Sequence, residues 1–152
     1  MIIVGTDAID VPMACQIQRA GHAVMDVDVF EASRQRAQAQ GIEAVSSIKE
    51  APEADVVVVM VATPLQALVA EALPQVGGQH WVTMSTVGPQ AVREAASLLM
   101  AAGAQVVDAP ATGGTARASA GELVIFASGA SAAITIVEPI LKAMGSVSVV
   151  GA

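Results

Sequence analysis

The sequence predicts an α/β domain with a mostly parallel sheet covered by helices on both faces. Apolar runs alternate with helix-like patterns along all 152 residues, the order typical of parallel strands joined by helical crossovers. The core must be aliphatic, because 54% of the residues are hydrophobic and only 2% are aromatic. Aliphatic cores are typical of buried parallel sheets. No linker or internal repeat interrupts the pattern, so residues 1–152 are expected to form one domain.

The first half of the chain shows the alternation most clearly. The run at 55–62 is β-branched and lacks polar alternation, so we expect it at the centre of the sheet. The short run at 42–45 is expected at an edge. Asp26 is out of place, because a fully buried strand rarely carries a carboxylate. Further strands are expected at 2–4 and 23–29, and helices at 12–20 (stopped by Gly21), at 31–40 and after Pro64.

The second half continues the same pattern. Gly88-Pro89 is a typical helix start. A short helix is expected to end at Ala120, and a longer one to bury Ile134, Val137 and Leu141. Strands are expected at 81–85, 105–107, 123–127 and 147–150.

Charge and cysteine content exclude several function classes. A net charge of -7 argues against binding to nucleic acid or to an anionic membrane surface, since both need basic patches. The most apolar run, 56–62, is too short to span a bilayer, and no basic leader precedes residue 2, so a cytoplasmic protein is expected. One cysteine, Cys15, and two histidines provide no disulfide and no recognisable metal site.

The turn after the first strand has the position of a phosphate-binding loop. A Rossmann-type dinucleotide fold places Gly-x-Gly-x-x-Gly there, for the tight turn, for approach of the diphosphate and for helix packing. This chain has Gly5-Thr6-Asp7-Ala8-Ile9-Asp10, so only the first glycine remains. The cofactor-binding residues expected here are Gly5, Thr6, Asp7, Ala8 and Ile9.

The two aspartates in this loop can be interpreted in two ways. Two like charges about 4 Å apart repel by roughly 4 kcal/mol at an effective dielectric near 20. Asp7 or Asp10 can instead accept the free N–H groups of the following helix, as a cap does, and so occupy the place of a phosphate. Alternatively, one aspartate is only a solvated cap and the cofactor binds weakly.

An acidic residue about 20 positions after the loop is expected to bind the ribose hydroxyls. Asp28, at the end of the second strand, is the candidate, although it can also be a strand-end residue facing solvent. Val29 follows it, with no arginine to meet a 2′-phosphate, so NAD is favoured over NADP.

Several segments together resemble the 3-hydroxyisobutyrate dehydrogenase family of β-hydroxyacid dehydrogenases, which is related to 6-phosphogluconate dehydrogenase. The resemblance extends over the whole chain, and one detail, Ala127-Ser128-Gly129, leans towards the L-threonate dehydrogenase branch. The matching segments are Val11-Pro12-Met13-Ala14, Gly21-His22, Met84-Ser85-Thr86-Val87-Gly88-Pro89, Asp108-Ala109-Pro110-Ala111-Thr112-Gly113-Gly114 and Ala120-Gly121-Glu122-Leu123.

The resemblance implies roles for particular residues. Thr86 would lie beside the nicotinamide ribose and the substrate, and Val61 and Ala62 stand where the family has Leu-Pro after its fourth strand. Thr112, Gly113 and Gly114 would hold the substrate carboxylate, since a hydroxyl and two unobstructed N–H groups can form an anion cradle. The alternative is that this segment is only a tight turn before a short helix.

The resemblance also implies a second, helical domain carrying a catalytic lysine. Lys49 and Lys142 are the only lysines here, and neither matches that motif; Lys142 is expected to face solvent. No catalytic residue is therefore expected in this chain. It is interpreted as the cofactor-binding half of an NAD(P)-dependent 3-hydroxyacid dehydrogenase, completed by a C-terminal domain or partner chain. The alternative is a degenerate, non-catalytic Rossmann module with an interaction or structural role.

Overall fold

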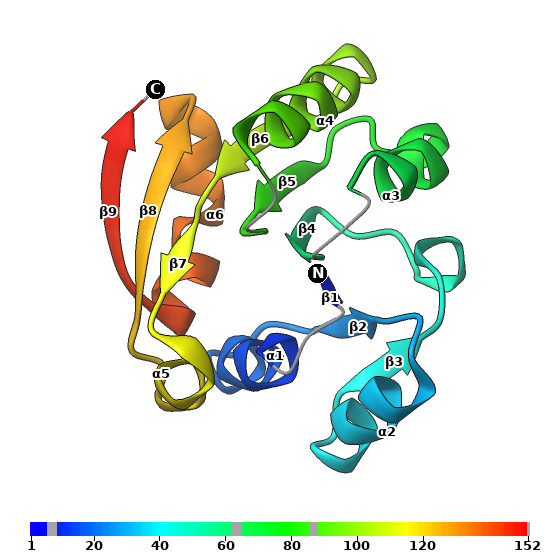
Figure 1. The fold of residues 1–152 in the computed structure, drawn as a ribbon, viewed down its shortest axis with the longest axis vertical. Coiled ribbons are helices and arrows are strands. Elements are labelled where there is room, and N and C mark those ends of the chain that lie inside the picture. Colours follow the sequence, from blue (N-terminus) through cyan, green and yellow to red (C-terminus); the bar gives the residue numbers. More distant parts are fainter. Residues whose placement is uncertain (6–8, 62–64, 86–87, 152) are drawn as a thin grey trace.

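A computed structural model describes residues 1–5, 9–61, 65–85 and 88–151. Figure 1 shows one continuous twisted sheet with helices packed on both of its faces. The first six strands are parallel neighbours in the order β3-β2-β1-β4-β5-β6. Their bounds are β1 (Ile2–Gly5), β2 (Met25–Val27), β3 (Glu43–Val45), β4 (Val56–Met60), β5 (His80–Thr83) and β6 (Gln105–Asp108).

The last three strands complete one end of the sheet. They are β7 (Ala111–Thr112), β8 (Leu123–Gly129) and β9 (Gly145–Gly151). β8 is antiparallel to both β6 and β7: its C-terminal end pairs with β6 and its N-terminal end pairs with β7. β9 pairs with β8 in parallel. The expected fold class, a mostly parallel sheet with helices on both faces, is therefore confirmed. β4 is central and β3 is at an edge, as expected.

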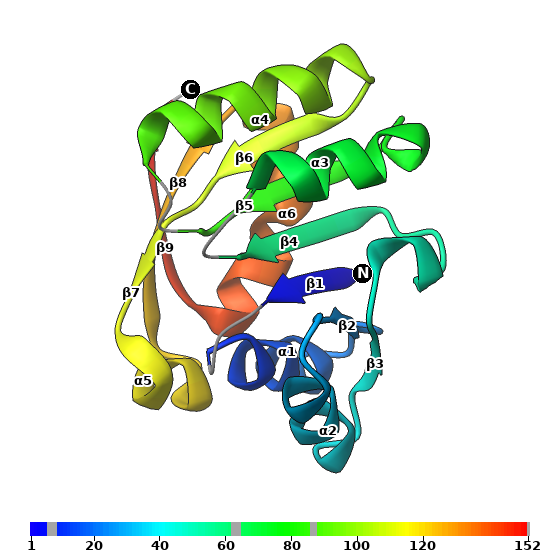
Figure 2. The ribbon, with the colours of Figure 1, turned by 45° about the vertical axis from the view of Figure 1, so that its right-hand side comes forward.

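The helices divide between the two faces of the sheet (Figure 2). α1 (Asp10–Arg19) packs with α5 (Gly114–Ala120) and α6 (Ser131–Met144), while α3 (Leu65–Ala72) packs with α4 (Pro89–Ala101). α2 (Glu31–Ala39) covers the β2–β3 edge beside α1, and two short 3-10 turns occupy Ile48–Glu50 and Leu73–Gln75. No helix among the described residues is long and apolar enough to cross a membrane.

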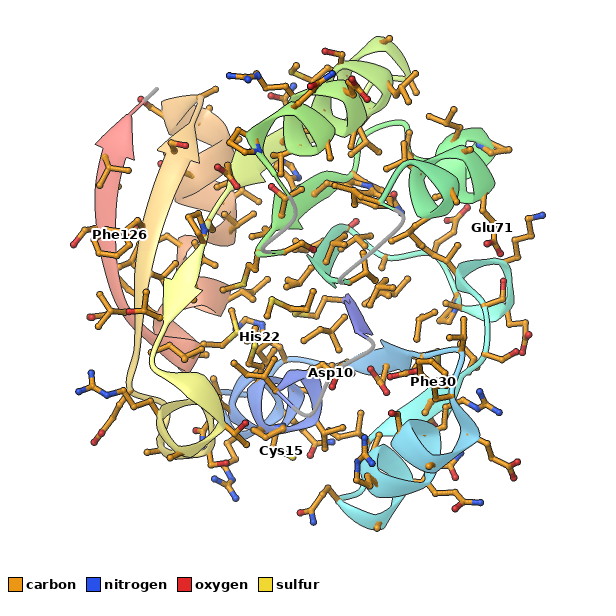
Figure 3. The ribbon with its side chains drawn as sticks, in the orientation of Figure 1. Asp10, Cys15, His22, Phe30, Glu71 and Phe126 are labelled. Carbon is orange, nitrogen blue, oxygen red and sulfur yellow. The ribbon has the colours of Figure 1, made fainter. Side chains whose placement is uncertain are left out.

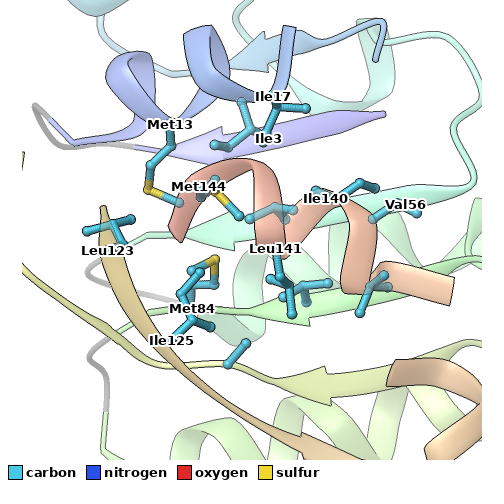
Figure 4. Packing of buried hydrophobic residues seen from close by; sticks show 14 of the residues in the cluster. Ile3, Met13, Ile17, Val56, Met84, Leu123, Ile125, Ile140, Leu141 and Met144 are labelled. Carbon is cyan, nitrogen blue, oxygen red and sulfur yellow. The ribbon is translucent and has the colours of Figure 1, made fainter. Parts of the chain in front are cut away.

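Two hydrophobic clusters form the core, one on each side of the sheet. Figure 4 shows the first, to which α1 contributes Met13 and Ile17 and α6 contributes Leu141 and Met144. The second lies beneath α3 and α4 and includes Trp81, the single tryptophan. Central strands contribute to both clusters, because alternate side chains of a strand point to opposite faces. This explains the unbroken apolar run in β4, where Val57, Val58 and Val59 are all fully buried.

Several boundaries differ slightly from the sequence expectation. α1 begins at Asp10 rather than Pro12, so the replaced third loop glycine is the first residue of the helix. β2 begins only at Met25. α1 ends where expected, because Gly21 takes a φ of 98°, a conformation that favours glycine.

Candidate functional site: the carboxyl edge of the sheet

The carboxyl ends of the parallel strands lie at one edge of the sheet, and the strand order changes direction at β1. From β1 the chain passes outward through β2 and β3, then returns to β4 on the other side of β1. In open α/β sheets, ligands bind outside the carboxyl ends of the strands at such a switch point. The geometry therefore places the candidate site at Gly5, between the ends of β2 and β4.

A cavity of about 240 Å³ opens beside this point. Its walls come from the ends of β1, β2 and β4, from the segment after β3 and from α3. They are largely apolar, apart from two serines in the segment after β3 and one glutamate of α3. The lining residues are Val4, Gly5, Val27, Val29, Ser46, Ser47, Ile48, Val61, Ala67, Leu68 and Glu71. Ser47 donates a hydrogen bond to Glu71, which links the segment after β3 to α3 across the cavity. Gly5 and Val61, two of the residues expected at the cofactor site, thus lie on one cavity wall.

Asp10 occupies the position of the third loop glycine, and its side chain turns toward the sheet (Figure 3). A Cβ atom added to Gly5 would overlap the Asp10 side chain. Any side chain at position 5 would therefore collide with the Asp10 carboxyl. In related folds the third loop glycine lets the helix pack closely on the strand. Here Asp10 replaces that glycine, and Gly5, the first glycine of the loop, provides the space for close packing.

Three carboxyl groups converge behind this loop. Asp10 of α1, Asp26 of β2 and Asp28 after β2 are at most 1% exposed, and each offers an oxygen within 4.8 Å of the others. Phe30 N–H donates to Asp28 Oδ1 at 2.9 Å, but the other five carboxylate oxygens have no hydrogen-bond partner among the described residues. Each ionised pair at this spacing would repel by roughly 3 kcal/mol at an effective dielectric near 20. Full ionisation is thus strongly disfavoured.

A proton held in this cluster relieves the repulsion. Burial, followed by the charge of Asp10, raises the pKa of Asp26 to about 8, and Asp26 in its protonated form can donate to Asp10. Burial and the charge of Asp28 raise the pKa of Asp10 to about 6. Three oxygens this close could also contact one cation, but hard cations take about six or more oxygen ligands. A proton shared between Asp26 and Asp10 fits this enclosed place better than a cation does, because it needs no additional space and no further oxygen ligands.

This geometry corrects the capping interpretation of Asp10. The cap position of α1 is Ile9, and Asp10 is already the first residue of the helix. Asp10 is neither a side-chain cap nor a solvated one, since it lies inside the helix and is fully buried. Its carboxyl pairs with β2 because glycine at position 5 leaves room for it there. Ile9 is half-buried at the start of the helix, while Thr6, Asp7 and Ala8 lie outside the described residues.

Asp28 stands where a ribose-binding carboxylate was expected, at the end of β2. Its side chain turns inward, because it accepts the Phe30 N–H at 2.9 Å and is only 1% exposed. The Arg34 guanidinium donates to the Asp28 carbonyl at 2.9 Å, which fixes the backbone at the same point. Asp28 is therefore not a strand-end residue facing solvent.

The segment expected to hold the substrate carboxylate lies at β7 and the start of α5. Thr112, Gly113 and Gly114 are exposed. Gly113 and Gly114 have φ values of 134° and 66°, which glycine adopts at little cost. Arg117 packs on Gly113, so closely that a Cβ added at position 113 would lie 2.7 Å from the Arg117 Cδ. The neighbouring strand end is fixed by Thr83, whose hydroxyl donates to Asp108 at 3.1 Å. Ala62 and Thr86 lie outside the described residues.

The carboxyl cluster is the feature that sequence reasoning missed. Two signals were present: Asp26 in a buried strand, and Asp10 at a position that needs close packing. Sixteen positions separate these two residues, and only strand pairing of β1 with β2 reveals that they meet. Lys142 is 62% exposed and pairs with Glu138 at 2.9 Å, which confirms that it faces solvent.

Comparison with known proteins agrees with this architecture. The family model for the NAD binding domain of 6-phosphogluconate dehydrogenase matches residues 2–151. The chain is 28% identical over 150 residues to 2-(hydroxymethyl)glutarate dehydrogenase of Eubacterium barkeri, covering 93% of this chain and 50% of that protein. It is 30% identical over 142 residues to human mitochondrial 3-hydroxyisobutyrate dehydrogenase, covering 89% of this chain and 42% of that protein.

Solved structures show the same similarity. Mycobacterium tuberculosis 3-hydroxyisobutyrate dehydrogenase with L-serine superposes with a TM-score of 0.90 at 25% identity, over 99% of this chain and 54% of that one. The Salmonella typhimurium 3-hydroxyisobutyrate dehydrogenase superposes with a TM-score of 0.87 at 28% identity, over 99% of this chain and 55% of that one. The chain thus spans about half the length of these relatives. It belongs to the family of NAD-binding domains of the 6-phosphogluconate dehydrogenase type, with relatives among the hydroxyacid dehydrogenases.

Proposed function

We propose that this chain is the cofactor-binding half of an NAD(P)-dependent 3-hydroxyacid dehydrogenase and that it does not turn over alone. The observation that carries the proposal is the apolar cavity beside Gly5, at the switch point of a sheet that matches the family along its length. Such a site suits the adenosine part of a dinucleotide. The bound cofactor supplies hydride transfer, and this half positions it.

Specific residues would share the binding. Gly5 and Val61 would form the wall against which the adenosine part lies, and Thr6–Ile9 would bind the diphosphate. Thr86 would contact the nicotinamide ribose. Asp28 meets the adenosine ribose once its inward-turned carboxyl rotates outward. Val29 on the cavity wall carries no charge, and the Arg34 guanidinium near the end of β2 already donates to the Asp28 carbonyl, so we propose that NAD is preferred over NADP.

The substrate side belongs to the same proposal. Thr112, Gly113 and Gly114 present a hydroxyl and backbone N–H groups at an exposed edge near the end of β6, where a small hydroxy acid would place its carboxylate. A C-terminal domain or a partner chain would supply the general acid/base, which must lie within hydrogen-bond reach of the substrate hydroxyl.

Dinucleotide binding is weakened in this chain. Asp10 brings a buried carboxyl to a place where related folds keep glycine, and Asp7 adds a second acid to the diphosphate turn. The enclosed carboxyl cluster also favours the second candidate function, a non-catalytic module that has lost its cofactor. The two functions differ in whether NADH binds once the acids are removed.

Calorimetric titration with NADH tests this directly. We expect the unaltered chain to bind weakly, and Asp10→Gly or Asp10→Asn to bind about tenfold more tightly, a change of about 1.4 kcal/mol. Asp10→Asn keeps the volume and removes the charge, so the pair separates steric from electrostatic obstruction. Glu31→Gln, at the start of α2, is the matched control and should change nothing.

Two results would contradict parts of this account. Micromolar affinity in the unaltered chain would disprove the impairment. Absence of binding in Asp7→Gly/Asp10→Gly, with the fold verified by circular dichroism, would favour the non-catalytic module. Comparing NADH with NADPH in the best-binding variant tests the preference assigned to Asp28 and Val29.

A further inference from the structure

A second concave surface lies between helices and shares no lining residue with the cavity beside Gly5. It measures about 430 Å³ and is formed by α1 and α2, with α5 at one end. We call it the α1–α2 groove. Its lining residues are Val11, Pro12, Cys15, Gln16, Arg19, Arg36, Ala39, Gln40 and Ser119. The volume lies within the range of about 300–1,000 Å³ that is usual for small-molecule sites.

Helical spacing gives the groove an apolar floor and a polar rim. Pro12, Cys15 and Arg19 lie three and four residues apart, so they share one face of α1. Val11 is 7% exposed, and Cys15 is half-buried beside it. Gln16 donates a side-chain hydrogen bond to the Ser119 carbonyl, which ties α1 to α5 and closes one end.

The charge of the groove is opposite to that of the molecule. The chain has 14 acidic and 7 basic residues, yet the lining contains two arginines and no aspartate or glutamate. Neither Arg19 nor Arg36 forms an ion pair with any residue that the structure describes. Arg36 Nη2 donates to Ser33 Oγ at 2.9 Å, which leaves its other N–H donors free to meet a ligand. Two guanidinium groups without an ion-pair partner in the described part of the chain, beside an apolar groove floor, suit a ligand that has an anionic group and an apolar body.

We propose that the α1–α2 groove binds a small carboxylate with an aliphatic or aromatic body, held by Arg19 and Arg36 at its charged end and by Val11, Pro12 and Cys15 along its carbon atoms. The site is separate from the dinucleotide crevice and goes beyond the proposed dehydrogenase role. Octanoate is the probe, with octan-1-ol as the uncharged analogue and acetate as the anion that lacks an apolar body.

Cys15 provides a direct readout, because it is the only cysteine and it lines the groove. Burial raises the pKa of its thiol, so alkylation by iodoacetamide should be slow enough to follow by mass spectrometry in mildly alkaline buffer. We expect millimolar octanoate to slow alkylation, with octan-1-ol and acetate much less effective. Calorimetry with octanoate should give a matching dissociation constant.

Variants of the two arginines test the charge requirement. Arg19→Gln and Arg36→Gln should each weaken octanoate binding about tenfold, which corresponds to about 1.4 kcal/mol. Arg93→Gln, on α4 at the other face of the sheet, is the matched control and should bind as the unaltered chain does. Unchanged melting temperatures would show that the variants remain folded.

Three results would overturn the proposal. They are no protection of Cys15 by octanoate in the folded chain, equal protection by octan-1-ol, or full binding in the Arg19→Gln/Arg36→Gln double variant. None of these outcomes depends on NADH, so failure here is distinguishable from failure of the dinucleotide proposal.

Discussion

At the scale of single residues, the buried carboxyl groups dominate the energetics of the site. Asp26 lies in β2 opposite Ile3 of β1, in register with it, and is fully enclosed. Its pKa of about 8 means that the folded chain holds a proton that the unfolded chain, with a pKa near 3.9, releases. Between about pH 4 and pH 8 the folded state therefore binds more protons, and the free energy of unfolding falls as pH rises.

This gives a pH-dependence that Asp26→Asn should reduce, leaving the smaller part that comes from Asp10. An amide at position 26 is uncharged and can donate to Asp10 as the protonated acid does. We expect the variant to be more stable than the unaltered chain by about 1–3 kcal/mol near pH 8, with the gap closing toward pH 5. Thermal unfolding across this range measures it, at about 2–4 °C per kcal/mol for a chain of this size.

An exposed carboxylate provides the comparison for that experiment. Glu43→Gln, on the neighbouring strand β3, should leave the pH profile unchanged because its side chain is exposed. The shared proton would be contradicted if the free energy of unfolding of the unaltered chain, compared with that of Asp26→Asn, increased from pH 5 to pH 8.

At the scale of elements, the turn between β7 and α5 depends on two glycines. Gly113 has a φ of 134° and its Cα lies against the Arg117 side chain, while Gly114 has a φ of 66°. Side chains rarely adopt these conformations, so the backbone groups of the proposed substrate loop are exposed in a geometry that only glycine allows cheaply. The same property serves a tight turn, so the loop's shape and its role must be tested separately.

Alanine substitution tests the shape. Gly113→Ala and Gly114→Ala should each lower the free energy of unfolding by about 1 kcal/mol or more, with the larger loss at Gly113, where Arg117 must also move. Gly77→Ala is the control, because its new Cβ would lie 3.8 Å from the nearest atom and no positive φ is required there. Urea unfolding of the three variants gives the comparison; equal losses at all three positions would refute the conformational argument.

At the scale of the whole molecule, the central parallel strands are buried on both faces, and the candidate site lies at their carboxyl edge. Neither lysine of the chain lies on the lining of the cavity beside Gly5. In the proposed function this half positions the cofactor, and another domain or partner chain supplies the general acid/base that hydride transfer needs. The relatives are about twice as long as this chain, which agrees with a division of labour between two halves.

The corresponding prediction is an activity measurement. The chain incubated with NAD and 3-hydroxyisobutyrate should produce no NADH above the rate without protein, even in the Asp10→Gly variant that is expected to bind the cofactor more tightly. Absorbance of NADH follows the reaction. Turnover by the chain alone that disappears in Thr112→Ala would show that the residues described here suffice for catalysis.

The fold was predictable from the sequence because its signals are local. A β-branched run such as Val56–Met60, a stop at Gly21 and a start at Gly88-Pro89 depend on backbone preferences of neighbouring residues. The position of the site followed from the same pattern, since parallel strands joined by helices bring Gly5 and the end of β2 to one edge.

The interior of the site was decided only by the tertiary structure. Sequence reasoning treated Asp10 as a cap and Asp28 as a solvent-facing or ribose-binding acid, and it left Asp26 unexplained. Strand register and the space above Gly5 bring the three carboxyls together and bury them. Their proton sharing depends on distances between segments remote in sequence, and likewise the groove at Arg19 and Arg36 exists only because α1 and α2 pack side by side. Local propensity specifies each element, whereas the contacts between elements set the electrostatics of the site.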